Sequence, residues 1–213
     1  MSYTTTSIRS ACTAQARYES PLGTMLLART VRGLAGAWFM NQKDHPGELD
    51  VPDQPDDVLL SRTAACFKRY FETGLADFGL PLDLRGTPFQ QRVWQALLDI
   101  PRGHTCSYGD IARQVGSPAA VRAVGAAVGR NPVAVIVPCH RVIGSNGSLT
   151  GYAGGLERKT ALLTLEGALG FATSGDAARS GRSSRSSLSS KRDQSGTTGA
   201  TVDPQSRLFE PAE

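Results

Sequence analysis

The chain has 213 residues, which is long enough for one large domain or two small ones. Hydrophobic residues make up 40% of it and charged residues 20%, as in an ordinary globular protein. No apolar run approaches the roughly 20 residues that span a bilayer, and the N-terminus has no apolar stretch typical of a signal peptide. We therefore expect a cytoplasmic protein with no membrane partner.

Charge is distributed unevenly along the chain. Lys and Arg number nine against ten Asp and Glu in residues 1–86, eight against four in residues 87–171, and six against five in residues 172–213. Most of the net charge of +4 therefore lies in the central segment. A basic segment of this kind favours a polyanionic partner such as nucleic acid.

The four cysteines are spread along the chain without a CxxC pair, at Cys12, Cys66, Cys106 and Cys139. This spacing indicates neither a disulfide framework nor a zinc knuckle. In a reducing compartment each cysteine should be a free thiol, so the question for each is its reactivity.

Residues 1–86 predict a small α/β domain with no evident chemistry of its own. Two β-rich runs flank Thr30–Gly33, which predicts a hairpin. The Asp- and Pro-rich residues 44–57 predict a loop. Apolar residues at helical spacing predict a helix over residues 58–74, and Gly74 is suited to cap its C-terminus.

Residues 87–171 predict a mostly helical domain. Thr87 and Pro88 suit the beginning of a first helix. A second helix is predicted over residues 107–116 and a third over residues 119–131, with a Gly-containing turn between them. This is the pattern of a helix-turn-helix that binds DNA. The same spacing also fits two packed helices with no role in nucleic-acid binding.

The third helix has an unusual exposed face. Val121, Val124 and Val128 share one face and are expected to anchor the helix in the core. The opposite face is composed of small side chains and one long cation, and its members are Ala119, Arg122, Ala123 and Ala126. Small side chains allow a close approach to a narrow surface, so this face suits a DNA minor groove better than a major groove.

Cys139 is the strongest candidate for a nucleophile. It follows the apolar run Val133–Val137, which predicts a buried strand or extended chain, and Pro138, which fixes the backbone. A thiol must lose its proton to attack, and His140 is the nearest base. Because adjacent side chains on an extended chain diverge, the two meet only through a turn or a bridging water. Spacing alone leaves open a purely structural Cys-His pair.

Glu166, on the following predicted helix, could orient the His140 imidazole. Beyond that helix the composition changes, and eight of the sixteen residues from Ser180 to Ser195 are Ser. Such a stretch cannot bury enough surface to offset its conformational entropy. Residues 172–213 therefore predict a disordered tail.

The sequence NPVAVIVPCHRV, followed by GSLTGYAGGLERKTALLTLEG, closely resembles the active-site region of the O6-alkylguanine-DNA alkyltransferases, also called methylated-DNA–protein-cysteine methyltransferases. The resemblance extends upstream through TPFQQRVWQALLDIPRGHTCSYGDIARQVGSPAAVRAVGAAVGRNP and so covers about residues 87–167. SPLGTMLLARTVRGLAGAWF is similar to the family's N-terminal domain. The resemblance implies an α/β (α+β) fold, in which a small ribonuclease-H-like α/β domain precedes a helix-turn-helix domain that binds DNA and carries the active site.

The resemblance also implies roles for individual residues. Cys139 would accept the alkyl group irreversibly, and His140 would act as its base through a bound water. Glu166 would hydrogen-bond that histidine, and Asn131 would support the active-site turn. Tyr108 would press on the phosphate of the target nucleotide and help to protonate the leaving guanine.

For DNA, the resemblance implies that Arg122 fills the gap left by a flipped nucleotide. The remaining expected DNA contacts are small side chains of the third helix: Ala119, Ala120, Ala123 and Ala126. The expected substrate-binding residues are Tyr152, which would pack on the alkylated base, together with Val142 and Ala153.

The implied activity is DNA repair by a methylated-DNA–protein-cysteine S-methyltransferase that turns over once. The alkyl group comes from O6-alkylguanine in double-stranded DNA, with O4-alkylthymine as a second candidate substrate, after base flipping through the minor groove. We expect a monomer without metal or organic cofactor. Some family members hold zinc in the N-terminal domain, but Cys12, Cys66 and His45 lack a matching set of partners.

Two other functions are compatible with parts of this sequence. A lesion-binding relative without transfer activity replaces the acceptor cysteine, usually by Trp, whereas Cys139 is present here. A transcriptional regulator would use the helix-turn-helix, and regulators in this family carry an additional cysteine cluster that this chain does not contain.

Overall fold

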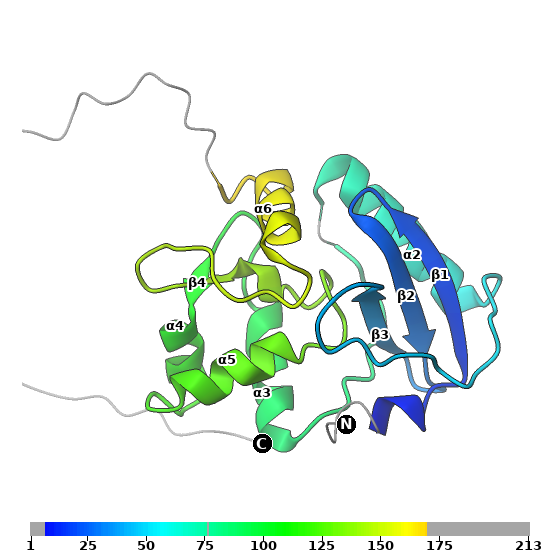
Figure 1. Ribbon diagram of the computed structural model, residues 1–213, viewed down its shortest axis with the longest axis horizontal. Helices are drawn as coiled ribbons and strands as arrows, with labels where there is room; N and C mark the ends of the chain where they lie inside the picture. The colour runs from blue at the N-terminus through cyan, green and yellow to red at the C-terminus, as the bar shows by residue number, and fades with distance from the viewer. Residues whose placement is uncertain (1–6, 76, 170–213) are drawn as a thin grey trace, which may run out of the picture. The chain divides into compact units, whose positions relative to one another are not determined.

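The computed structural model of the protein describes residues 7–75 and 77–169 (Figure 1). The predicted disordered tail, residues 172–213, lies outside the described residues. None of the described helices is long and apolar enough to cross a bilayer.

The N-terminal part is a three-stranded antiparallel sheet in the order β1-β2-β3 (Figure 1). Its strands are β1 (Ala14–Ser20), β2 (Gly23–Arg29) and β3 (Leu34–Phe39). Thr30–Gly33 joins β2 to β3, which confirms the predicted hairpin.

Both faces of this sheet are buried. Met25 and Leu27 of β2 belong to the main core, which also includes Phe67 of the helix α2 (Val58–Thr73). Leu26 and Trp38 point to the other face and pack with Leu49 in a second, smaller cluster. Because successive strand residues alternate between faces, burial of both explains why β3 is apolar throughout.

The two ends of α2 are fixed by caps. The side chain of Asp57 accepts hydrogen bonds from the backbone N–H groups of Leu59 and Leu60, and its carboxylate also pairs with Arg29 at 2.6 Å. Gly74 ends the helix in the left-handed region, at φ 69°, where glycine has no steric penalty. The predicted helix and its C-terminal cap are confirmed.

The second part of the chain is mainly helical. Its elements are α3 (Pro88–Leu98), β4 (Cys106–Ser107), α4 (Tyr108–Gln114), α5 (Val121–Gly129), the 3₁₀ turn η1 (Cys139–Arg141), β5 (Val142–Ile143) and α6 (Leu156–Leu165). The predicted fold class, a small sheet domain followed by helices, is confirmed.

α3 anchors the helix-turn-helix. Thr87 caps α3, and its capping box with Gln90 satisfies two backbone donors. The indole of the buried Trp94 donates to the Ala127 carbonyl at 2.8 Å and so ties α3 to α5. Between α4 and α5 the chain turns at Gly116, whose φ is +70°. This is the arrangement that the predicted helix-turn-helix requires.

Two details of the third predicted helix were wrong. α5 begins at Val121, so Ala119 lies in the preceding turn and Ala120 at the N-cap. Val121 is 40% exposed and does not anchor the helix, because the first turn projects beyond the core. The buried positions are Val124, Ala127 and Val128.

The segment Val133–Val137, predicted as a buried strand or extended chain, is buried as expected and Val133 forms a β-bridge with Ala37, but the segment is not a continuous strand. Its backbone makes a turn at Val135, whose φ is +71°, and Val137 N–H donates to the Val133 carbonyl. Ala134 N–H donates to Ala37 of β3 at 2.9 Å, so this turn is fastened to the N-terminal sheet. A positive φ is unfavourable for a β-branched residue, so the surrounding contacts must hold the turn in place.

Candidate active site

Cys139 is the first residue of η1, directly after Pro138, and only 4% of it is exposed. Its sulfur accepts a hydrogen bond from Nδ2 of Asn131 at 3.0 Å. Among the described residues, no hydrogen bond joins the thiol to the His140 ring. The two side chains therefore do not hydrogen-bond directly, and the bridging water stays a prediction.

Asn131 fixes the backbone that leads to the thiol. Its Nδ2 also donates to the Val137 carbonyl at 2.8 Å, and its Oδ1 accepts from the Val133 N–H at 3.0 Å. One amide therefore holds both ends of the buried turn and contacts the sulfur. The resemblance implied this supporting role, and the geometry is consistent with it.

Burial raises the pKa of the Cys139 thiol to about 11. The Asn131 hydrogen bond, the charge of Lys159 and the backbone N–H groups of Cys139 and His140 act in the opposite direction and stabilise the thiolate. The resting site is therefore a protonated thiol surrounded by groups that favour its deprotonated form.

Glu166, at the C-cap of α6, receives four hydrogen bonds. Oε1 accepts from His140 Nε2 at 2.9 Å, Tyr70 Oη at 2.8 Å and Arg141 Nη2 at 2.9 Å. Oε2 accepts from Arg141 Nε at 2.7 Å. Burial raises the pKa of this carboxyl, but the hydrogen bonds and charges of His140 and Arg141 outweigh it and hold the pKa at about 2.

An ionised Glu166 determines which nitrogen of His140 carries the proton. Nε2 must donate to the carboxylate, so the lone pair of the neutral ring lies on Nδ1. Nδ1 is buried and has no hydrogen-bond partner among the described residues. Burial lowers the pKa of His140, so the ring is neutral near pH 7 and its Nδ1 can accept a proton.

One member of this network was not foreseen from the sequence. Tyr70 comes from α2 in the N-terminal part and reaches Glu166 across 96 positions of the chain, a pairing that no local pattern reveals. Arg141, another partner of Glu166, has a structural position, because its Nη1 also donates to the Ile100 carbonyl at 2.6 Å.

Lys159 on α6 was also missed, although it is fully buried. Its Nζ donates to the carbonyls of Val142 at 2.5 Å and Thr150 at 2.6 Å. Burial lowers its pKa to about 8, and the nearby Cys139 raises it in turn. A signal was present, since Lys159 and Glu166 share helical spacing with the buried Leu162.

The substrate loop, defined here as Thr150–Gly155, lies beside this network. Tyr108, the first residue of α4, donates through its hydroxyl to the carbonyls of Thr150 at 3.2 Å and Gly151 at 3.0 Å. The Tyr152 ring lies edge-on to His140, with the centroids 6.5 Å apart, and its buried hydroxyl has no partner among the described residues. Tyr152, which the sequence predicts to pack on the alkylated base, therefore lies beside His140.

The two other predicted substrate residues differ in exposure. Val142 begins β5 and is buried, whereas Ala153 is half-buried in the loop.

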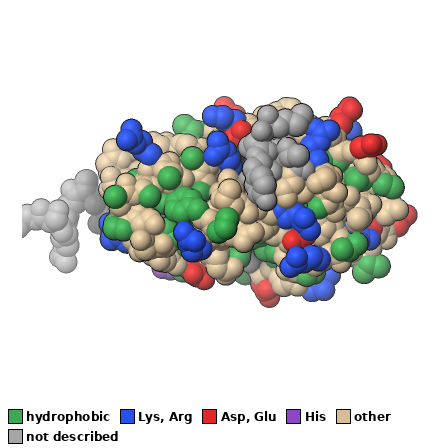
Figure 2. Space-filling view, turned by 90° about the horizontal axis from the view of Figure 1, so that it is seen from below, with side chains coloured by type: hydrophobic (Ala, Val, Ile, Leu, Met, Phe, Trp, Pro, Cys, Tyr) green, Lys and Arg blue, Asp and Glu red, His purple; other side chains and the backbone are tan. Residues whose placement is uncertain are grey.

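The predicted DNA-contacting residues lie on α5 and just before it. Arg122, Ala123 and Ala126 are exposed on the helix, Ala119 is exposed in the preceding turn, and Ala120 is half-buried. Figure 2 shows hydrophobic side chains gathered on part of the molecular surface, with Lys and Arg around them.

A metal site is not evident in residues 7–75 and 77–169. No group of three or more His, Cys, Asp or Glu side chains there is arranged to hold a metal ion. Cys12, Cys66 and Cys106 are free thiols, and burial raises the pKa values of Cys12 and Cys106 to about 11.

Two family models match most of the described chain. Residues 15–84 match the ribonuclease-like domain of 6-O-methylguanine DNA methyltransferase, and residues 88–168 match its DNA-binding domain. The chain belongs to the 6-O-methylguanine DNA methyltransferase family. This confirms the sequence-based prediction of the family and of an enzyme.

Named relatives in the family are similar over most of their length. A Mycobacterium bovis methylated-DNA–protein-cysteine methyltransferase is 51% identical over 148 residues, 70% of this chain and 88% of that protein. The inducible enzyme of that name from Bacillus subtilis is 49% identical over 150 residues, 66% of this chain and 82% of that protein.

Solved structures of family members have the same fold. Mycobacterium tuberculosis OGT in complex with DNA is 47% identical, with a TM-score of 0.66, over 72% of this chain and 92% of that one. An O6-methylguanine DNA methyltransferase from Methanococcus jannaschii is 28% identical, with a TM-score of 0.54, over 71% of this chain and 92% of that one.

Proposed function

We propose that the protein repairs double-stranded DNA by transferring an alkyl group from O6 of an alkylated guanine to its own Cys139, once per molecule. The observation that carries this proposal is a buried thiol next to an imidazole whose Nδ1 is unpartnered, in a chain similar to methylated-DNA–protein-cysteine methyltransferases. The protein acts in the cytoplasm as a monomer, without a metal or organic cofactor.

The reaction is a displacement at the alkyl carbon. The Cys139 thiol proton passes through a bridging water to Nδ1 of His140, and the Glu166 carboxylate stabilises the imidazolium that forms. The sulfur forms a bond to the alkyl carbon while the bond from that carbon to O6 breaks. The electron pair of the broken bond remains on the guanine, which takes up a proton with the help of the Tyr108 hydroxyl.

The product is a thioether, and neither water nor a second substrate removes the alkyl group from it. Each molecule therefore reacts once. Asn131, Lys159 and the backbone N–H groups next to the sulfur lower the free energy of the thiolate at the moment of attack. Their proximity to a thiol with a pKa of about 11 supports a nucleophile that is activated only when substrate and base are in place.

The lesion lies within the DNA base stack, so the nucleotide must be flipped out, at a cost of a few kcal/mol. The exposed face of α5 suits the minor groove, because Ala123 and Ala126 permit close approach. Arg122 projects from the same face and occupies the place of the flipped nucleotide. Tyr152 then packs on the alkylated base, next to Val142 and Ala153.

The domain organisation follows from the same reasoning. Residues 1–86 form the N-terminal domain and residues 87–171 form the alkyltransferase domain. The boundary is supported by the Thr87 cap of α3 and by family matches that end at residue 84 and resume at residue 88.

Incubation with duplex DNA that contains O6-methylguanine tests the chemistry directly. Trypsin should release residues 131–141 as one peptide, and this peptide should gain one methyl group. The gain should be absent in Cys139→Ala. A methyl group on Cys106, or none on any peptide, would contradict the mechanism, and tight lesion binding without transfer would favour the lesion-binding alternative.

Arg122→Ala separates DNA recognition from chemistry. This variant should react much more slowly than the wild type with O6-methylguanine in duplex DNA, and at the same rate with the free base, which needs no flipping. Equal slowing with both substrates would place Arg122 in the chemical step instead.

A further inference from the structure

Every backbone carbonyl from Thr150 to Gly154 accepts a hydrogen bond. Two of the five carbonyls are held by side chains of the helical part, since Tyr108 and Lys159 donate to Thr150 and Tyr108 also donates to Gly151. The Tyr152 carbonyl accepts from the Gly155 N–H within the loop, at 3.0 Å. The carbonyls of Ala153 and Gly154 remain, and their donors connect the loop to the N-terminal sheet.

Arg158, in the first turn of α6, makes the main connection. Its Nη1 donates to the Gly154 carbonyl at 2.9 Å, and its Nε donates to the Leu22 carbonyl, in the turn between β1 and β2, at 2.8 Å. The guanidinium also lies over the ring of Phe39 in β3, 4.6 Å from its centroid. One side chain therefore contacts the substrate loop, the turn between β1 and β2, and strand β3.

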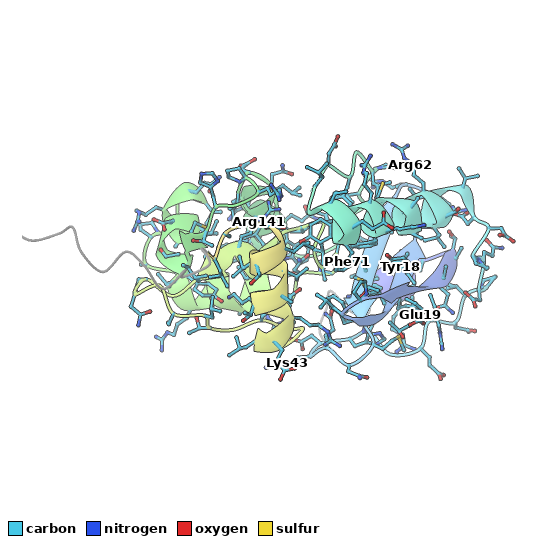
Figure 3. The ribbon with its side chains drawn as sticks, turned by 90° about the horizontal axis from the view of Figure 1, so that it is seen from above. Tyr18, Glu19, Lys43, Arg62, Phe71 and Arg141 are labelled. Carbon is cyan, nitrogen blue, oxygen red and sulfur yellow. The ribbon has the colours of Figure 1, made fainter. Side chains whose placement is uncertain are left out.

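Lys43 makes the second connection through its backbone. Lys43 lies four residues after the end of β3, and its N–H donates to the Ala153 carbonyl at 2.9 Å. In Figure 3, Lys43 and Arg141 lie near opposite ends of α6, where the helical part meets the N-terminal part. The loop that carries Tyr152 is thus held from both parts of the protein.

We propose that Arg158 is a positioning residue, which couples the substrate loop to the N-terminal sheet and so holds Tyr152 and Ala153 where they meet the alkylated base. The inference rests on the proposed function. It gives the N-terminal domain a part in substrate binding, although that domain supplies no group to the reacting atoms.

The geometry requires arginine rather than lysine. Arg158 donates to two carbonyls in different directions while its flat face lies on an aromatic ring, and a single ammonium cannot do all three. The partner turn is adapted to this side chain, because a Cβ on Gly23 would come within 3.2 Å of Nη2 of Arg158. Gly23 also has a φ of +108°, which side chains rarely adopt.

The test compares Arg158→Ala and Arg158→Lys with two controls. Arg62→Ala removes another arginine that donates to a backbone carbonyl, that of Gly79, and Arg62 lies well away from α6 in Figure 3. Lys68→Ala removes an exposed lysine of α2. All four variants and the wild type are reacted as full chains with free O6-benzylguanine, and the limiting rate and the half-saturating concentration are measured separately.

We expect Arg158→Ala to raise the half-saturating concentration about tenfold or more, because a displacement of about 1 Å in a positioning group can cost that much. Arg158→Lys should recover part of this loss, and both controls should match the wild type. The limiting rate should change much less. Hydrogen exchange at the amides of residues 150–155 should be faster in both Arg158 variants, while exchange in α5 is unchanged.

An unchanged half-saturating concentration and unchanged loop exchange in Arg158→Ala would overturn the inference. If that variant does not fold, Arg158→Lys decides by the same two measurements. If the wild type transfers no alkyl group to Cys139, the proposed function fails, and loop exchange in the Arg158 variants still decides whether the loop is coupled to the sheet.

Discussion

Lys159 contributes a buried positive charge that stabilises the Cys139 thiolate. Because its pKa is about 8, this charge is present near neutral pH and is lost as the pH rises through 8. The thiol itself, with a pKa of about 11, gains thiolate as the pH rises. The two titrations oppose each other, so the rate should rise less steeply above pH 8 than below it.

Lys159→Met should therefore raise the pKa of Cys139 and slow alkyl transfer at pH 7. Each unit by which that pKa rises lowers the fraction of Cys139 present as thiolate at neutral pH about tenfold. Single-turnover rates between about pH 6 and pH 10 measure the effect, with the exposed Lys68→Met as the matched control. If the variant reacts like the wild type at every pH, Lys159 does not contribute to the activation of the Cys139 thiol.

At this scale the sequence identifies residues that a motif carries and misses those that only packing brings close. Cys139, His140, Glu166 and Asn131 were expected, and they form two hydrogen-bonded pairs, Asn131 with the Cys139 sulfur and His140 with Glu166. Tyr70 was not expected, because its role depends on how α2 lies against the C-terminus of α6.

Among the elements, α3 depends on its N-terminal cap. Thr87→Ala removes the side-chain acceptor for the Gln90 N–H and breaks the capping box. We expect a loss of about 1 kcal/mol in the free energy of unfolding. Urea denaturation measures it, and Thr160→Ala, which removes an exposed hydroxyl within α6, should change stability by less than about 0.5 kcal/mol. Equal losses of unfolding free energy in Thr87→Ala and Thr160→Ala would show that the Thr87 cap does not stabilise the protein more than an ordinary exposed hydroxyl does.

The exposed face of α5 offers a second prediction at this scale. Ala126→Leu keeps helix propensity but adds bulk to the exposed surface that we propose faces the minor groove. The variant should bind duplex DNA at least about tenfold more weakly, a loss of about 1.4 kcal/mol. Ala65→Leu makes the same change at an exposed site on α2 and should have no effect, and transfer from the free base should be normal in both. Normal duplex binding by Ala126→Leu would exclude this face from the DNA interface.

Caps and turns were predictable at the level of elements because they depend on local residue types, such as Thr87-Pro88 and Gly74. The segment Val133–Val137 was not, because five apolar residues favour a strand. Their turn exists only because Asn131 and β3 hold it from outside the segment. The exposure of Val121 was likewise not predictable, because it depends on which turns of α5 pack against the core and the residue is the first of that helix.

At the scale of the whole molecule, the N-terminal part contacts the site in four places. Ala37 of β3 holds the turn before Cys139, and Tyr70 donates to Glu166. The substrate loop is connected to the sheet by Arg158 and to the segment after β3 by the Lys43 N–H. The sequence indicated no chemistry in residues 1–86, since none of these contacts uses a reactive side chain in a recognisable pattern. The catalytic half therefore depends on a domain that appeared independent of it.

The Tyr70 contact predicts a pH-dependent effect on stability. The pKa of Glu166 is lowered from 4.5 to about 2 in the folded protein, so its ionised form stabilises the fold above pH 4.5. That stabilisation is lost as the pH falls from 4.5 towards 2. Tyr70→Phe removes one hydrogen bond to the carboxylate, and it should cost about 2 kcal/mol at pH 7 because the acceptor is charged.

The difference between Tyr70→Phe and the wild type should shrink as Glu166 becomes protonated, because the lost hydrogen bond is strongest to the ionised form. Urea denaturation at pH 7, 5 and 3 measures this trend. Tyr18→Phe, at a half-buried tyrosine of β1 (Figure 3), provides the control and should show a small, pH-independent change. A loss of equal size at all three pH values would mean that Tyr70 contributes packing alone and does not support the charge of the Glu166 carboxylate.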